Sequence, residues 1–205
     1  MKKILCFSWL LAGSLAFCGA AQAQTAPASE APSTGKPAFL RLGLGTAYDI
    51  EGYYRSARVS VEYAPMLSRR IGLASRVVGL VGKPTSGMET QLPNQNYKGG
   101  YLEQEVVFYP FENNQRLNLG LGAGGFAGFY RLNGFDHYTA VDGKFTEYQL
   151  ERRQGFHGGY LLSLNLDVAL GETKRWRVGT KATLQNGAEG NRRASTYNLT
   201  LARRL

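Results

Sequence analysis

The segment 159–170 alternates apolar and polar residues along its whole length. Its apolar members all share one parity: Tyr160, Leu162, Leu164, Leu166, Val168 and Leu170. Successive side chains of a strand point to opposite faces, so this period of two predicts a strand with one apolar and one polar face. Helical spacing would scatter the same leucines around a cylinder. The apolar row is long enough for a membrane-spanning strand, which needs about 9–11 residues. A strand of a soluble β-sandwich remains the alternative at this point.

Seven further segments repeat the alternation, which gives eight predicted strands in all. They cover residues 39–48, 53–64, 70–81, 100–109, 116–130, 159–170, 176–184 and 194–205. The connections after the second, fourth and sixth strands are short, whereas those after the third and fifth are long and polar, at 82–99 and 132–155. Short turns at one end and long loops at the other are typical of outer-membrane barrels.

The distribution of charge separates a membrane barrel from a soluble one. In mid-strand the apolar parity carries no charged residue, and its polar members are Thr46, Ser75, Gln104 and Thr180. A soluble lipocalin-like barrel would instead need a polar outer face and an apolar lumen. The opposite parity is rich in small residues and carries nine charged ones, which we expect to form an interior polar network: Arg41, Arg58, Glu62, Arg76, Glu103, Glu105, Asp167, Arg177 and Lys181.

The sequence therefore predicts an all-β fold, an eight-stranded antiparallel up-and-down transmembrane β-barrel, over residues 38–205. Aromatic residues near the strand ends agree with this prediction, because interfacial girdles are placed there. We expect one girdle near the long loops, with Tyr48, Tyr53, Phe129 and Tyr160, and one near the short turns, with Tyr63, Phe108 and Trp176.

The first 23 residues have the pattern of an export signal. Lys2 and Lys3 precede an apolar run, and Ala21-Gln22-Ala23 fits the small-residue cleavage pattern. Both cysteines, Cys6 and Cys18, lie within it, so the mature chain would have no thiol chemistry. Residues 24–37 are rich in Pro, Ala, Ser and Thr and are predicted to be a flexible leader.

With its signal, eight alternating segments and unequal connections, the chain resembles the small eight-stranded outer-membrane barrels of the OmpA and OmpX type. The resemblance implies an outer-membrane location, contact with outer-membrane lipid and lipopolysaccharide, and insertion by the outer-membrane assembly machinery. We expect a monomer. One feature departs from the family, in which the last residue is usually aromatic. This chain ends in Leu205, and Arg203 interrupts its last apolar row.

The residues favour a non-enzymatic barrel with extracellular loops for structural or surface-interaction roles. An outer-membrane hydrolase, such as a lipid-A-modifying enzyme, and a small pore are the alternatives. A hydrolase would need a histidine beside a serine, and neither His137-Tyr138-Thr139 nor His157-Gly158-Gly159 supplies the His-x-Ser pair of the lipid A deacylases. We expect no cofactor, and two histidines so placed give no metal site. We also expect no nucleic acid, because basic residues occur singly in spite of the formal charge of +9. Inside the barrel, Glu103 and Glu105 should pair with inward arginines and close the lumen.

Overall fold

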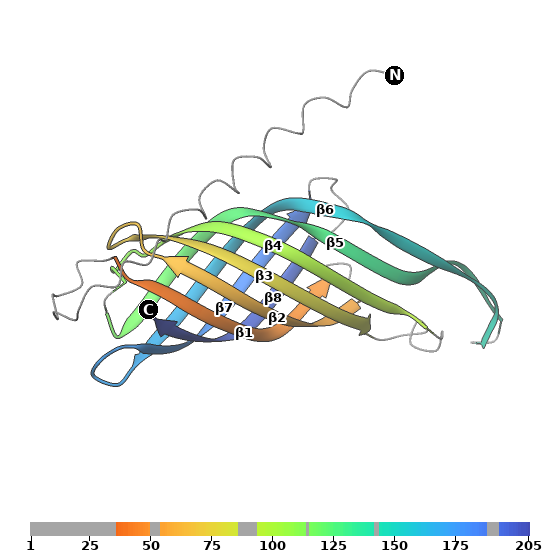
Figure 1. Cartoon of the computed structure of the whole chain (residues 1–205). Coiled ribbons are helices and arrows are strands. Elements are labelled where there is room, and N and C mark those ends of the chain that lie inside the picture. Colours follow the sequence, from red (N-terminus) through yellow and green to blue (C-terminus); the bar gives the residue numbers. More distant parts are fainter. Residues whose placement is uncertain (1–35, 50–53, 86–93, 114, 142–143, 188–192) are drawn as a thin grey trace, which may run out of the picture. The chain divides into compact units, whose positions relative to one another are not determined.

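A computed structural model describes residues 36–49, 54–85, 94–113, 115–141, 144–187 and 193–205. Its eight strands form a closed barrel in which each strand pairs with its neighbour in the sequence and β8 pairs back with β1 (Figure 1). All pairings are antiparallel. The predicted fold is therefore confirmed. The predicted signal peptide, and residues 24–35 of the predicted leader, lie outside the described residues.

The strands are β1 (Ala38–Asp49), β2 (Tyr54–Pro65), β3 (Ile71–Pro84), β4 (Asn96–Phe108), β5 (Leu117–Val141), β6 (Lys144–Leu170), β7 (Trp176–Gly187) and β8 (Arg193–Arg204). Within the part of the chain that the structure describes, no helix is long and apolar enough to cross a membrane.

The two parities of the alternating sequence form the outer and the inner face of the barrel wall. Leu164 on β6 is 47 % exposed, whereas its neighbour Asn165 is 1 % exposed. The same contrast runs around the barrel, so the outer surface is a continuous belt of Leu, Val and aromatic side chains. Two of the polar residues on the outside bond to each other, since Ser75 Oγ donates to Gln104 Oε1 at 2.8 Å. Such pairing suits a lipid-facing surface, because lipid offers no hydrogen bonds.

The two ends of the barrel differ as predicted. The connections after β2, β4 and β6 are short and lie together at one end, here called the turn end, together with the C-terminus (Figure 1). One of these turns uses Gly171 at φ +68°, a backbone conformation that side chains disfavour. The opposite end, called the loop end, holds the connections after β1, β3, β5 and β7.

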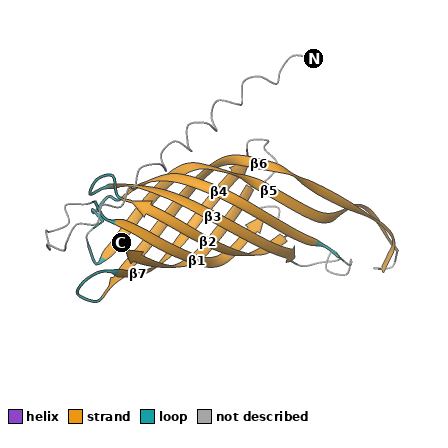
Figure 2. Ribbon diagram, viewed as in Figure 1, coloured by secondary structure: helices purple, strands orange, loops and turns teal. Residues whose placement is uncertain are grey.

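The sequence-based expectation of long loops at 82–99 and 132–155 is wrong in extent. β3 and β4 reach into the first of these segments, and β5 and β6 continue as paired strands through most of the second. The resulting β5–β6 hairpin projects well beyond the rest of the barrel (Figure 2). Two register shifts, between Phe135 and His137 and between Thr139 and Ala140, interrupt its pairing. The period of two is lost in this part of the sequence, so alternation alone did not predict that the strands extend there.

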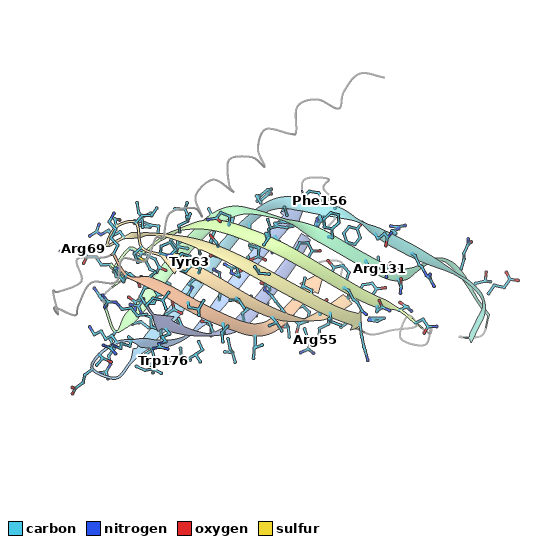
Figure 3. The ribbon with its side chains drawn as sticks, viewed as in Figure 1. Arg55, Tyr63, Arg69, Arg131, Phe156 and Trp176 are labelled. Atoms are coloured by element: carbon cyan, nitrogen blue, oxygen red, sulfur yellow. The ribbon has the colours of Figure 1, made fainter. Side chains whose placement is uncertain are left out.

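The aromatic residues predicted at the rims face outward where the structure describes them. Phe129 and Tyr160 are 68 % and 55 % exposed, and Tyr63 and Trp176 are 49 % and 44 % exposed. Figure 3 shows Tyr63 and Trp176 toward the turn end and Phe156 toward the loop end. Tyr53 lies outside the described residues. This arrangement matches the two aromatic girdles of a membrane barrel.

Candidate functional site

The interior of the barrel is crossed by a row of alternating charges. Pairing between strands sets Arg41 on β1 opposite Glu62 on β2, Glu62 opposite Arg76 on β3, and Arg76 opposite Glu103 on β4. All four point inward and are at most 4 % exposed. Opposite charges directly across a strand pair attract, so the strand register itself favours this row.

Arg76 is the centre of the network. Its Nε donates to Glu62 Oε2 at 2.8 Å and its Nη2 to Glu105 Oε1 at 2.7 Å, while its Nη1 bonds Glu103. One guanidinium thus contacts three carboxylates from β2 and β4. The planar fork of an arginine, with its five donors, suits this role.

Two further groups extend the network across the lumen. Arg41 donates to Glu62 Oε1 at 2.5 Å and to Asp167 Oδ2, on β6, at 2.6 Å. From β7, Lys181 bonds Glu105 and lies 3.3 Å from Glu62 Oε2. These contacts join strands on opposite sides of the barrel.

Glu103 and Glu105 have further hydrogen-bond partners. Arg58 Nη2 lies 2.8 Å from Glu103 Oε1, and Gln185 Nε2 donates to the same oxygen at 2.7 Å. Ser163 Oγ donates to Glu105 Oε2 at 2.8 Å. The connected set contains equal numbers of each sign: the cations Arg41, Arg58, Arg76 and Lys181, and the carboxylates Glu62, Glu103, Glu105 and Asp167. A balanced buried set avoids the cost of an uncompensated buried charge.

Glycines on the inner wall make room for these side chains. A Cβ at Gly122 would lie 2.3 Å from Ser163 Oγ and 3.0 Å from Glu105 Oε2, and one at Gly179 would lie 2.2 Å from Asp167 Oδ1. The close approach of the charged side chains to the neighbouring strands therefore requires glycine there.

Arg177, the ninth predicted residue, lies apart from the central network. It bonds the side chain of Asn113, donates through Nη2 to the Asn113 backbone oxygen at 2.6 Å, and lies 4.3 Å above the ring of Phe39. The structure thus brings eight of the nine predicted residues into one network and places Arg177 nearer the turn end.

Two apolar clusters cover the charged layer. The cluster toward the turn end contains Phe39, Ala64, Met66, Ala74, Val107 and Tyr109. Burial raises the pKa of the Tyr109 phenol, which favours its neutral form. The cluster toward the loop end contains Ala47, Val78, Leu80, Tyr101, Phe126 and Leu161. The interior is therefore layered, with charges between two apolar seals. The seals do not follow from alternation, because their members come from several strands, one or two from each, and meet only in the closed barrel.

Along one wall of the interior, several buried polar atoms have no hydrogen-bond partner in the protein. Buried polar atoms without a protein partner occur on β6, β7 and β8: both side-chain polar atoms of Asn165, the hydroxyls of Thr183 and Thr196, and Asn198 Oδ1. Register places Asn165 and Asn198 on either side of Lys181. Buried polar groups are normally satisfied by protein or by water, so this wall is where water or a polar solute would bind.

Of the two histidines considered for catalysis, the structure describes the side chain of His157. It lies among aromatic rings, with its centroid 5.2 Å from that of Phe126 and 6.2 Å from that of Tyr101, both in edge-to-face geometry. A hydrogen bond of His157 at the rim stays a prediction. The side chain of His137 lies outside what the structure describes. Across the described ranges, no group of three or more His, Cys, Asp or Glu side chains could hold a metal ion.

The terminal strand carries the departure noted in the sequence. Arg203 is exposed, and its guanidinium lies 5.7 Å from the centroid of the Trp176 ring, at the turn-end rim. Leu205 is 67 % exposed. The charge that interrupts the last apolar row therefore lies at the rim and not in the middle of the apolar belt, in keeping with a side chain that reaches toward the interface.

Comparison with known proteins supports the fold. No protein-family model and no curated protein matches the sequence. Among solved structures, Ail, the attachment invasion locus protein of Yersinia pestis, is similar with a TM-score of 0.55 at 11 % identity, over 83 % of this chain and 99 % of that one. The outer membrane protein OprG of Pseudomonas aeruginosa is similar with a TM-score of 0.52 at 10 % identity, over 83 % and 96 % of the two chains.

These similarities, together with the closed barrel and its apolar belt, define the class. The chain has the fold of the small eight-stranded outer-membrane β-barrels.

Proposed function

We propose that this protein is a non-enzymatic barrel of the outer membrane whose filled interior makes it a rigid support for the projecting β5–β6 hairpin. The observation that carries the proposal is the pairing of an apolar outer belt with a charged interior in which each carboxylate of the central network is paired with a cation. Large exposed apolar surfaces mark membrane or protein contacts. Here the apolar surface runs around all eight strands, which suits lipid better than a partner on one side.

The interior serves stability in this proposal. An eight-stranded barrel is only just wide enough for side chains to fill, and ion pairs between opposite walls hold this one closed. Recognition would fall to the loop end, because binding residues concentrate on segments held by a rigid scaffold. The β5–β6 hairpin extends furthest there (Figure 2).

The partners follow from the location. The belt would contact outer-membrane lipid, including lipopolysaccharide, and the assembly machinery would insert the chain through its last strand. A closed barrel has no free strand edge, which favours a monomer.

Cell fractionation and protease treatment of intact cells test the proposal. The protein should separate with the outer membrane, and added protease should cut first within residues 134–151 and leave the turns at 66–70 and 171–175 intact. Recovery in a soluble fraction would overturn the proposed location. Cleavage at the turns with protection of the hairpin would reverse the orientation.

A small pore is the second candidate, favoured by the polar wall of β6–β8. A water-filled path would follow Asn198 and Thr196 along β8, beside Lys181 and Thr183 on β7. The apolar seals at both ends oppose it. Conductance measurements separate the two candidates and are described in the Discussion.

A further inference from the structure

The outer surface near the loop end carries cations that face each other. Strand pairing sets Arg55 on β2 opposite Lys83 on β3, and Lys98 on β4 opposite Arg131 on β5. All four are exposed. Like charges directly opposite each other destabilise a sheet. An anion placed between such a pair would remove the repulsion.

The partners of these cations within the protein are neutral. Arg131 donates to Gln154 Oε1 at 3.1 Å, and Arg55 lies 5.5 Å from the centroid of the Tyr48 ring. Among the residues that the structure describes, none of the four cations forms an ion pair. No carboxylate of the described residues therefore compensates these four charges.

A groove of about 620 Å³ lies beside the second pair. Its floor is a row of cross-strand partners at inward-facing positions: Leu80, Gly99, Tyr130 and Gly155. Its other lining residues are the outward neighbours of that row: Lys98, Gly100, Phe129, Arg131 and Gln154. Since the inward neighbours Tyr97 and Tyr101 do not line it, the groove opens on the outside of the barrel.

Glycine creates the space. A Cβ at Gly100 would meet nothing within 4 Å, and the same holds for Gly79, its direct partner on β3. Phe129, also opposite Gly100, is 68 % exposed and contacts Phe156 edge to face at a centroid distance of 5.5 Å. The groove thus has cations on its loop-end side and an apolar aromatic wall on its turn-end side. Figure 3 labels Arg131 and Phe156 in this part of the barrel.

We propose that this groove binds a phosphorylated, acylated lipid of the outer leaflet. Lys98 and Arg131 hold the phosphate, and an acyl chain lies over Gly79 and Gly100 against Phe129. Arginine binds phosphate through two parallel hydrogen bonds, and lysine adds a compact charge. The groove lies where the apolar belt ends, at the depth of a lipid headgroup. The membrane location of this site rests on the proposed function, whereas lipid binding can be tested without it.

Native mass spectrometry of the full chain, refolded in an uncharged detergent, tests the proposal. The probes are bisphosphorylated lipid A, phosphatidylcholine and inorganic phosphate. Wild-type protein should retain one lipid A molecule and bind phosphatidylcholine at least about tenfold more weakly, because the latter carries no net charge. The double variant Lys98→Gln/Arg131→Gln should bind lipid A about 30-fold more weakly, since each cation near an anionic headgroup contributes roughly fivefold.

Two variants separate the groove from general surface charge. Gly100→Leu keeps every charge and fills the groove without a clash, so it should also weaken lipid A binding about tenfold or more. Arg55→Gln/Lys83→Gln removes an equal charge at the same rim but outside the groove, so it should change binding less than about threefold. The unfolding midpoint of each variant should stay near that of the wild type.

Each outcome of these measurements bears on a different part of the proposal. Equal losses in the two double variants would show diffuse attraction and overturn the groove. Binding of inorganic phosphate as tight as that of lipid A, or unchanged binding by Gly100→Leu, would overturn the acyl-chain part and with it the proposal. Selective lipid A binding by a protein that does not separate with the outer membrane would refute the proposed location and leave the lipid site standing.

Discussion

Arg41 on β1 and Asp167 on β6 are separated by 126 residues, yet Arg41 Nη2 lies 2.6 Å from Asp167 Oδ2 inside the barrel. Neither strand is a neighbour of the other in the sheet. The contact therefore crosses the lumen and ties the wall formed by β1 and β2 to the wall formed by β6. A barrel whose walls are joined in this way resists opening.

Loss of one central carboxylate should destabilise the barrel. Glu103 accepts from Arg58, Arg76 and Gln185. Its replacement by alanine removes the carboxylate that pairs with buried Arg58, whereas Arg76 keeps Glu62 and Glu105. We expect Glu103→Ala to lower the free energy of unfolding by about 3–5 kcal/mol, the usual cost of breaking a buried pair. Urea unfolding of protein refolded in lipid vesicles measures this change.

The matched control for that experiment is Arg55→Ala, an exposed cation on the outer face. Its effect should stay within about 0.5 kcal/mol, as for most surface substitutions. Membrane fractionation should be unchanged for both variants. If Glu103→Ala unfolded like the control, the interior network would not be a stabilising element.

A charged side chain on the outward face should lower the free energy of unfolding more, the nearer it lies to the middle of the apolar belt. Leu164 pairs with Leu121 and Ala182 in the middle of the apolar belt, so Leu164→Arg should cost about 2–4 kcal/mol of unfolding free energy. Leu184, nearer the loop end of β7, is the control, and Leu184→Arg should cost about 0–1 kcal/mol. Equal costs at both positions would show that the belt does not lie in hydrocarbon as described.

The projecting hairpin should be dispensable for folding. Gly134 and Glu151 are register partners, so replacing residues 135–150 by Asn-Gly allows a two-residue turn to close β5 onto β6. Because the residues that the structure places in the two interior clusters all lie outside 135–150, the free energy of unfolding should change by less than about 1 kcal/mol. Failure of the shortened chain to refold would show that the hairpin belongs to the folding unit.

The same shortened protein tests the role of the hairpin. If surface recognition resides there, cells that produce it should lose any binding to host or neighbouring cells that the full chain confers, at equal amounts in the outer membrane. Retained binding would move the recognition surface to another part of the loop end.

The sequence was sufficient for the fold because one physical signal, the period of two, continues through every strand. It separates Leu164 from Asn165 and places all nine predicted charges inside. The expectation that Glu103 and Glu105 would meet arginines rested on the need to balance buried charge. The particular partners depend on strand register and on side chains reaching across the lumen, as Arg41 does, and neither follows from alternation.

The period of two in the sequence does not predict features whose residues do not alternate between apolar and polar. The sequence of the projecting β5–β6 hairpin does not alternate apolar and polar residues as the barrel strands do. Its β-branched and aromatic residues and the Asp142-Gly143 pair were the signals that could have found it. The groove was missed because Gly79 and Gly100 become neighbours only through the register of β3 with β4.

Planar-bilayer recording of refolded wild-type protein tests the central claim that the interior is closed. The charged layer and the two apolar seals predict no steady single-channel steps above the noise of protein-free bilayers. The variant Phe126→Ala/Leu161→Ala opens the loop-end seal but leaves the charged layer in place, so it should remain silent as well. Steady, reproducible single-channel steps from the wild-type protein would contradict a closed interior and establish a pore.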